Sequence, residues 1–240
     1  MSYILVIPAR YKSSRFPGKP LVLINGVPMI IRTYNQCKKI VNKKNIYVAT
    51  DDNRIQNICQ KNDINVVMTS KKCLTGTDRV AEVAKKIKVN TYINVQGDEP
   101  TLNPNDLKKL IKFSQKDPKN IINGYCRINK NSLYNNFNIP KLVFKRNGDL
   151  MYMSRAAIPA SKDKKFKVGF RQVCMYAFPY KALQSFNNQK KKTIFEDIED
   201  IEILRFIEMG YSVKMLKMSD KSISVDTKAD LTKLKKIKFR

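Results

Sequence analysis

Histidine is absent from this 240-residue chain, and the other residues that usually build metal or redox centres are sparse. Without an imidazole, the chain lacks the commonest general base and metal ligand. Its five cysteines are widely scattered and form no C-x-x-C pair, so neither a structural zinc site nor a disulfide framework is expected. Any catalysis must therefore use carboxylates, cations, backbone groups and a bound metal.

Long apolar runs are also missing. No stretch approaches the about 20 apolar residues that a membrane helix needs, and no charged, apolar, small-residue signal sequence opens the chain. We therefore expect a cytoplasmic protein with no membrane partner. Its length and its 42% hydrophobic content suit one substantial α/β domain spanning residues 1–240.

Acidic residues are few, 20 against 47 lysines and arginines, and the formal net charge is +27. A charge of this size raises nucleic acid as a partner. The basic residues are spread over the whole chain, however, and no RNA-binding motif with interleaved aromatic residues is present. We expect no nucleic-acid partner, and a basic nucleic-acid-binding protein stays as the alternative from a different class.

The stretch from Val6 to Pro20 is the most informative part of the chain. It begins within an apolar run typical of a buried strand, and its prolines and glycine exclude a helix, so it should be a loop at a strand end. The loop carries Arg10, Lys12, Arg15 and Lys19 with the hydroxyls of Ser13 and Ser14. No acidic residue precedes Asp51. This pattern predicts a polyanion site, with a solvated basic loop as the alternative.

The rest of the first half alternates strands and helices. Strands are predicted at residues 46–50, 66–68 and 91–95, and helices at 28–40, 53–61 and 105–116. This order predicts a mostly parallel sheet covered by helices on both faces. There is no G-x-G-x-x-G and no G-x-x-x-x-G-K-[ST], so the known dinucleotide and P-loop fingerprints are excluded.

An acidic turn, Gln96 to Pro100, follows the strand at 91–95. Ligands of open α/β sheets lie beyond the carboxyl ends of the strands, so this turn should face the same crevice as the basic loop. A carboxylate beside a polyanion site can hold a divalent metal that bridges it to phosphate. The alternative is an acidic cap for the helix at 105–116.

The second half contains four further signals. Asn147-Gly148 between short apolar segments predicts a β-hairpin. An apolar stripe predicts one helix from Ile194 to Met209, in which the acidic residues would favour the helix dipole. Leu74 to Arg79 resembles a helix cap provided by Thr77 or Asp78. Ile223 to Val225 should be a final strand, followed by a helix that Asp226 could cap.

Several of these stretches together resemble the sugar-acid cytidylyltransferases, and especially those acting on 3-deoxy-manno-octulosonate (Kdo). Ile7 to Leu21 is similar to that group's I-P-A-R-x-x-S-x-R-x-P-G-K-P-L signature, and Gln96 to Pro100 to its Q-G-D-E-P turn. Leu74 to Arg79 resembles S-G-T-[DE]-R, Ser154 to Pro159 resembles Y-F-S-R-A-x-I-P, and Val225 to Leu231 resembles V-D-T-x-x-D-L. The resemblance covers essentially the whole chain, in order.

The resemblance implies a three-layer, Rossmann-like nucleotidyltransferase fold with a mostly parallel central sheet. It also implies a hairpin-containing region at about 130–180 that pairs subunits into a homodimer and lines the sugar site. The implied reaction transfers CMP from CTP to the anomeric hydroxyl of Kdo and releases pyrophosphate, for lipopolysaccharide or capsule biosynthesis. Two Mg²⁺ ions would activate the hydroxyl and hold the triphosphate.

Site roles come from the resemblance, residue by residue. For CTP it implies Pro8, Ala9, Arg10, Ser13, Ser14, Arg15, Lys19, Thr75, Gly76, Arg79, Gln96 and Asp98. For the sugar acid it implies Arg155, Gln172, Tyr176, Glu199 and Glu202. Asp98 and Asp226 would be the metal ligands, and Arg10, Lys19, Asp98 and Asp226 the catalytic set.

Two positions on the sugar side depart from the pattern. Gln172 stands where the group usually has histidine, and Asp200 where serine is more frequent. Since both lie near the expected sugar site, an 8-amino analogue of Kdo or a nine-carbon sialic-type acid is kept as the alternative acceptor.

Overall fold

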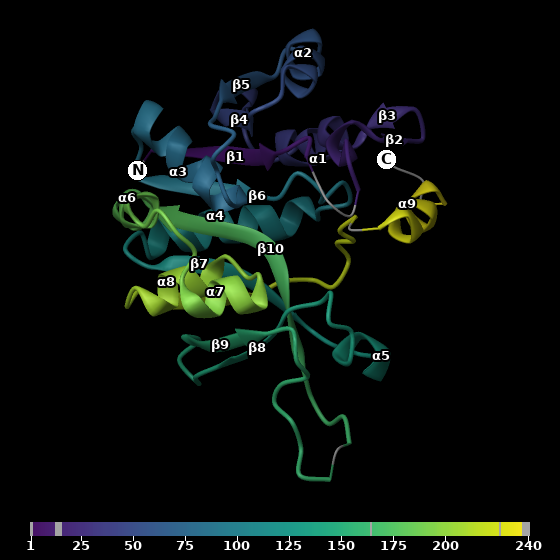
Figure 1. The fold of residues 1–240 in the computed structure, drawn as a ribbon, viewed down its shortest axis with the longest axis vertical. Coiled ribbons are helices and arrows are strands. Elements are labelled where there is room, and N and C mark those ends of the chain that lie inside the picture. Colours follow the sequence, from purple (N-terminus) through teal and green to yellow (C-terminus); the bar gives the residue numbers. More distant parts are fainter. Residues whose placement is uncertain (1, 13–15, 164, 226, 237–240) are drawn as a thin grey trace.

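A nine-stranded, mostly parallel sheet forms the centre of the computed structural model, which describes residues 2–12, 16–163, 165–225 and 227–236 (Figure 1). Its main path runs β11 (Val213–Lys217), β7 (Ile121–Arg127), β10 (Phe170–Pro179), β6 (Thr91–Val95), β1 (Tyr3–Ala9), β4 (Ile46–Thr50) and β5 (Asn65–Met68). Neighbours are parallel except β10, which is antiparallel to both β6 and β7. The predicted mostly parallel sheet is confirmed.

Helices cover both faces of this sheet. One face carries α1 (Met29–Lys38), α2 (Asn53–Lys61) and α4 (Pro104–Lys116), and the other carries α3 (Gly76–Lys86), α6 (Tyr180–Asn188) and α8 (Ile203–Glu208). Alternation along β1 divides its side chains between them: Leu5 and Ile7 join the first core, and Ile4 and Val6 the second. The three-layer architecture is confirmed. No helix in the described part of the chain is long and apolar enough to cross a membrane.

The predicted hairpin is present as β8 (Lys141–Phe144) and β9 (Leu150–Ser154), preceded by the short helix α5 (Asn131–Tyr134). Gly148 at its turn has φ +86°, a conformation that glycine adopts without strain. Through the pairing of Lys141 with Arg171, β8 also joins β10. Figure 1 shows the hairpin directly below α7 (Ile194–Glu199), at the lower edge of the layered body.

The single helix expected from Ile194 to Met209 is wrong, because the structure contains two short helices, α7 and α8, separated at Asp200. Asp200 has φ +50°, the left-handed conformation, which ends α7. A continuous helix would direct the Glu202 side chain differently, and in the structure that carboxylate binds the start of α3. Tertiary contacts therefore override the helical periodicity.

The strand expected at Ile223 to Val225 is also wrong. This segment forms no sheet ladder, because its backbone is bonded to Thr101 and Asp98 instead. The helix expected after it is confirmed as α9 (Lys228–Lys235), which packs over the small sheet of β2 (Leu23–Ile24) and β3 (Val27–Pro28). Two 3-10 turns, Lys19–Leu21 and Lys43–Asn45, complete the elements.

Candidate active site

A cavity of about 260 Å³ lies at the carboxyl ends of β1 and β6. One side of its lining includes Pro8, Ala9, Arg10, Lys19, Thr75, Gly76, Arg79, Gln96 and Asp98. Its opposite side includes Asn138, Pro140, Arg155, Gln172, Tyr176, Asp200 and Glu202. The acidic turn and the described part of the basic loop therefore share one crevice, as expected for an open α/β sheet. Ser13, Ser14, Arg15 and Asp226 lie outside the described residues.

Lys19 joins the basic loop to the acidic turn. Its Nζ lies 2.6 Å from Asp98 Oδ2 and donates a second hydrogen bond, 2.9 Å long, to the Val225 carbonyl. Both side chains are largely buried, 17% exposed for Lys19 and 25% for Asp98. The residue before Lys19, Gly18, has φ +70° and starts the 3-10 turn that directs the lysine into the cavity.

The acidic turn packs tightly against the end of β1. A Cβ added to Gly97 would lie 2.8 Å from the Pro8 carbonyl oxygen, so only glycine allows this approach. The Thr33 hydroxyl donates to the Gly97 carbonyl at 3.1 Å, and the Val225 N–H donates to the Asp98 carbonyl at 3.0 Å. The backbone of the turn that carries Asp98 is therefore held by three contacts.

Helix α3 begins at the cavity wall. Thr75, not the expected Thr77 or Asp78, is its N-cap, and Asp78 completes a capping box by accepting from the Thr75 N–H at 2.7 Å. A Cβ on Gly76 would lie 3.0 Å from Gln96 Oε1, so the first turn of α3 lies directly against Gln96. Any shift of α3 would therefore change this side of the cavity.

Arg79 is 3% exposed and already paired. Its guanidinium lies 2.9 Å from Asp51 Oδ2 and donates to the Thr69 hydroxyl at 2.7 Å. It lines the cavity, but these contacts hold the loop between β5 and α3. Its implied contact with the nucleotide stays a prediction.

Glu202 extends from the start of α8 to α3. Oε1 accepts from the Gly76 N–H at 3.1 Å, and Oε2 accepts from the Thr77 N–H at 2.8 Å and from the Thr77 hydroxyl. Loss of water around the carboxylate raises the pKa of Glu202, and the hydrogen bonds from Thr77 and Gly76 oppose that shift. Both oxygens are thus engaged by α3 rather than directed only at the cavity.

Arg155 provides a fixed positive charge on the opposite side of the cavity. Its guanidinium donates to the backbone carbonyls of Glu199, Asp200 (2.9 Å) and Phe137 (3.1 Å). The Glu199 carboxylate accepts from the Ser154 hydroxyl at 2.6 Å and from the Arg155 N–H at 2.8 Å. Glu199 does not line the cavity and instead supports Arg155.

Gln172 and Tyr176 project from β10 into the same side. Gln172 Nε2 donates to Asn123 Oδ1 at 3.0 Å, which orients the amide. Tyr176 is 5% exposed, and burial raises its pKa well above 10, so the phenol stays protonated. Both offer neutral polar atoms beside the Arg155 cation.

Comparisons with known proteins agree with this geometry. A family model described as Cytidylyltransferase matches residues 4–223. The chain belongs to the cytidylyltransferase family. An 8-amino-3,8-dideoxy-manno-octulosonate cytidylyltransferase of Shewanella sp. (strain W3-18-1) is 38% identical, with 97% of each chain covered. The corresponding protein of Shewanella baltica (strain OS185) is 36% identical over the same share.

Comparison with solved structures supports the same family. A CMP:2-keto-3-deoxy-manno-octonic acid synthetase complexed with CTP superposes with a TM-score of 0.90 at 32% identity, covering 98% of this chain and 97% of that one. HddC from Yersinia pseudotuberculosis, with a TM-score of 0.70, 16% identity and 98% of both chains covered, shares the fold. The Rossmann-like fold and the nucleotidyltransferase activity predicted from the motifs are therefore confirmed, and the nucleic-acid-binding alternative is not favoured.

Sequence reasoning missed part of this cytidylyltransferase's site. Asn138 and Pro140 line the cavity from the loop before β8, where no motif marks them. Lys141 is fully buried, donates to the carbonyls of Asn136 and Arg155, and has its pKa lowered by burial. In a lysine-rich chain, nothing in the sequence distinguishes a buried lysine from an exposed one, so the burial of Lys141 is seen only in the structure.

No group of three His, Cys, Asp or Glu side chains gathers as a metal site among the described residues. The cytidylyltransferase does present the Asp98 carboxylate in the cavity, beside the Val225 carbonyl, which immediately precedes Asp226 in the chain. Magnesium typically binds through one or two carboxylates, substrate phosphates and waters rather than in an all-protein cage. The donor set present therefore fits Mg²⁺ in that mode.

Proposed function

We propose that the protein transfers CMP from CTP to the anomeric hydroxyl of an eight-carbon 3-deoxy-2-keto sugar acid of the Kdo type. The anomeric oxygen would bond to the α-phosphorus, the bond between the α-phosphorus and the bridging oxygen would break, pyrophosphate would leave, and the proton of the hydroxyl would pass to water. One observation carries this proposal: a single cavity joins the cations Arg10 and Lys19 and the carboxylate of Asp98 to a fixed Arg155.

On the nucleotide side, Arg10 and Lys19 would bind the triphosphate together with Ser13, Ser14 and Arg15. Gln96, with the backbone at Ala9 and the start of α3, would contact the cytidine. Because a pentavalent phosphorus gathers negative charge on its oxygens, cations held in place before the reaction stabilise the transition state. Lys19 would have to exchange its 2.6 Å contact with Asp98 for a phosphate oxygen.

Asp98 and Asp226 would hold Mg²⁺. When bound, the metal neutralises phosphate charge and lowers the pKa of the sugar hydroxyl. The packing of Gly97 against Pro8 and the ion pair with Lys19, which hold Asp98 at the cavity, support this proposal.

On the acceptor side, Arg155 would bind the sugar carboxylate, because a guanidinium pairs well with a planar carboxylate. Gln172 and Tyr176 would bind sugar hydroxyls, and Glu199 would act by holding Arg155. The experiment is a pyrophosphate-release assay with CTP, Mg²⁺ and either Kdo, its 8-amino analogue or N-acetylneuraminic acid. Release with an octulosonate only is expected; release with none of them, or with N-acetylneuraminic acid only, contradicts the proposal.

The 8-amino analogue is a specific second candidate for the acceptor. The relatives that are 36–38% identical carry its name. In addition, Asp200 adds a carboxylate to the cavity lining, where an ammonium group would be attracted. Asp200 is already 2.9 Å from Lys192 Nζ and 64% exposed, so this attraction would be modest.

Replacing Asp200 by asparagine is expected to lower the ratio of kcat/KM for the 8-amino acceptor to that for Kdo by up to about fivefold, since an exposed ion pair contributes about 0.2–1 kcal/mol. Asparagine tolerates the left-handed backbone at this position, so the turn is kept. An unchanged ratio in a variant with wild-type activity on Kdo would argue against a role for Asp200 in selecting the acceptor.

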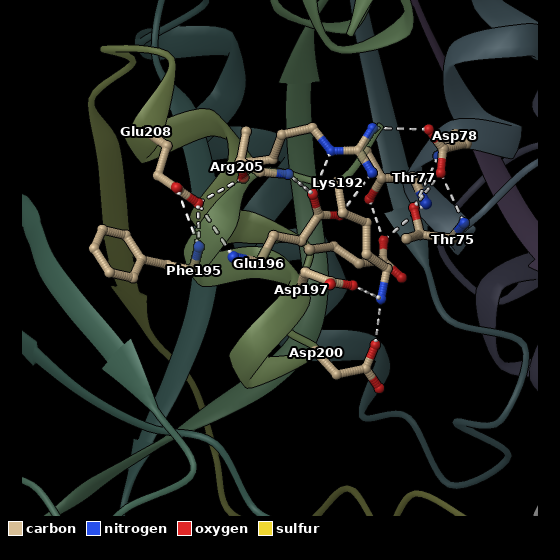
Figure 2. Close-up of polar contacts among 12 residues, drawn as sticks. Thr75, Thr77, Asp78, Lys192, Phe195, Glu196, Asp197, Asp200, Arg205 and Glu208 are labelled. Atoms are coloured by element: carbon tan, nitrogen blue, oxygen red, sulfur yellow. Dashed lines mark hydrogen bonds and ion pairs between the residues drawn. The ribbon is translucent and has the colours of Figure 1, made fainter. Parts of the chain in front are cut away.

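We also propose that the protein is a homodimer. Ile194, Phe195 and Ile198 are 71%, 49% and 75% exposed on α7, and Figure 2 shows the Phe195 ring directed away from the polar contacts of that helix. The ring packs edge-on against Tyr152 of β9, 6.2 Å between centroids, so the apolar surface continues toward the hairpin. A second copy of this chain would cover it.

The variant Ile194→Asp/Ile198→Asp is expected to shift the protein from dimer to monomer, measured by light scattering after size exclusion at micromolar concentration. Leu23→Asp, which places the same charge at a 54% exposed leucine on the small sheet, serves as the control and should stay dimeric. A monomeric wild-type protein, or a dimer that survives both changes on α7, would contradict the assignment of this surface.

A further inference from the structure

The N-terminus of α3 is closed by a carboxylate from the acceptor half of the protein. Glu202 takes the N–H groups of Gly76 and Thr77 at 3.1 and 2.8 Å, together with the Thr77 hydroxyl. The first N–H groups of a helix attract anions, and a phosphate is their usual ligand in nucleotide sites. Here the Glu202 carboxylate occupies that position. Its negative charge would repel a triphosphate, so only the neutral parts of a nucleotide, the base and the ribose, are compatible with the cavity wall formed by the start of α3.

The same turn of α3 defines the nucleotide side of the cavity. A Cβ on Gly76 would lie 3.0 Å from Gln96 Oε1 and 3.3 Å from Pro8 Cγ, so the first turn of α3 packs closely against both residues. A shift of α3 toward them would therefore be transmitted to Gln96 and the end of β1.

A buried ion-pair network reinforces the connection between α8 and α3. Arg205, fully buried, lies 2.6 Å from both Glu196 oxygens and 3.0 Å from Asp78 of the α3 capping box, as Figure 2 shows. Its guanidinium also stacks at 3.7 Å over the Phe186 ring. The segment from Glu196 to Arg205 and the start of α3 are therefore held as one unit.

The middle of this segment holds Arg155. The carbonyls of Glu199 and Asp200 accept from the Arg155 guanidinium, and Glu202 follows two residues later in the chain. One short stretch thus contacts both the cation expected to bind the acceptor acid and the helix start expected to bind the nucleotide.

We propose that Glu202 is a positioning residue for the nucleotide: by closing the N-terminus of α3 it fixes Gly76 and Gln96 in the geometry that binds the neutral base and ribose of CTP. This inference rests on the proposed function, because it assumes that CTP occupies this wall. It differs from a role for Glu202 in binding sugar hydroxyls, and the two roles predict opposite kinetic effects.

The test is Glu202→Gln, with CTP affinity measured by calorimetry in the absence of acceptor. Glutamine offers one acceptor oxygen, and its NH₂ group would face the α3 donors, so charge-assisted hydrogen bonds are lost. We expect CTP binding about tenfold weaker or more, with the acceptor KM at saturating CTP close to wild type. Thr77→Val, which removes only the hydroxyl donor, should weaken CTP binding in the same direction by a smaller factor.

Glu208→Gln is the matched control. Glu208 also lies on α8 and also caps a helix, accepting from the Thr193 hydroxyl at 2.5 Å and from the N–H groups of Phe195 and Glu196 at 3.1 Å. The helix that it caps, α7, does not line the cavity. Its loss should lower thermal stability and leave CTP affinity unchanged.

The outcomes separate the two proposals. If the wild-type protein binds no CTP, the proposed function itself fails. If the wild type binds CTP but Glu202→Gln raises only the acceptor KM, Glu202 binds the sugar and the inference is overturned. Equal losses of CTP affinity in Glu202→Gln and Glu208→Gln would also overturn it, since general loosening would explain both. Should Glu202→Gln fail to fold, unchanged CTP affinity in Thr77→Val overturns it.

Discussion

Replacing Arg205 by methionine is expected to lower the free energy of unfolding by about 3–5 kcal/mol, the usual result of leaving a buried charge without its partner. Arg205 and Glu196 are 0% exposed, and Arg205 is the only cation within 4.0 Å of Glu196 in the described part of the chain. Methionine would fill much of the volume and keep some contact with Phe186. The measurement is equilibrium unfolding in urea.

The reason for this loss can be tested by the double variant Arg205→Met/Glu196→Gln. Glutamine removes the stranded charge and keeps an acceptor for the Thr193 N–H, which Glu196 binds at 3.2 Å. We expect the double variant to be more stable than Arg205→Met alone. Lys43→Met, which breaks an exposed pair of 2.6 Å with Asp63, should give no resolvable change. A double variant less stable than the single one would contradict the argument.

Replacing Asp98 by asparagine is expected to reduce kcat by at least about 10²–10³-fold, as for loss of one preorganised electrostatic group at a reacting centre. Asparagine keeps the shape of the side chain but loses the charge that would bind Mg²⁺ and that now pairs with Lys19. The fold should be unaffected, since the turn is held by backbone contacts of Gly97 and Asp98. The measurement is acceptor-dependent pyrophosphate release over a titration of Mg²⁺.

Asp63→Asn provides the control for this change. Asp63 also lies 2.6 Å from a lysine Nζ, but it is 83% exposed and outside the cavity lining. Its activity should match the wild type. Near wild-type activity of Asp98→Asn at any magnesium concentration would remove Asp98 from the metal site.

The part of the cavity around Lys19 and Asp98 was easier to predict from the sequence than the part around Arg155. The stretches Val6 to Pro20 and Gln96 to Pro100 are each contiguous in the sequence, and each lies at the carboxyl end of a strand that fixes its place. Local pattern and overall topology agree there. The part around Arg155 is assembled instead from the loop before β8, from β10 and from the start of α8, which lie far apart in the chain.

Two incorrect predictions, the single helix from Ile194 to Met209 and the strand from Ile223 to Val225, have the same physical cause: contacts between residues far apart in the chain. The periodicity from Ile194 to Met209 gives no sign that Asp200 breaks the helix, because the break serves a contact between Glu202 and Thr77, 125 residues apart. Likewise, Ile223 to Val225 has the composition of a strand, but its backbone groups bind Thr101 and Asp98. Neither partner can be identified from local sequence.

The strand β7 was not predicted from the sequence, for a different reason. β7 contains Asn123-Gly124, a pair usually typical of turns. In the structure, the Asn123 amide donates to the carbonyls of Val173 and Met175, where the β7–β10 register shifts. A Cβ on Gly124 would lie 2.3 Å from the Met218 sulfur, so glycine leaves room for that side chain to pack on β7. Both residues are explained by packing, not by a turn.

The most direct test of the reaction is to follow the phosphorus atoms of CTP. The protein would be incubated with Mg²⁺, an octulosonate acceptor and CTP labelled with ³²P at either the α or the γ position. The proposed function predicts that the α label appears in an acceptor-dependent CMP-sugar and that the γ label is released only in pyrophosphate. Transfer of the γ label to the sugar, or release of pyrophosphate that does not depend on the acceptor, would contradict it.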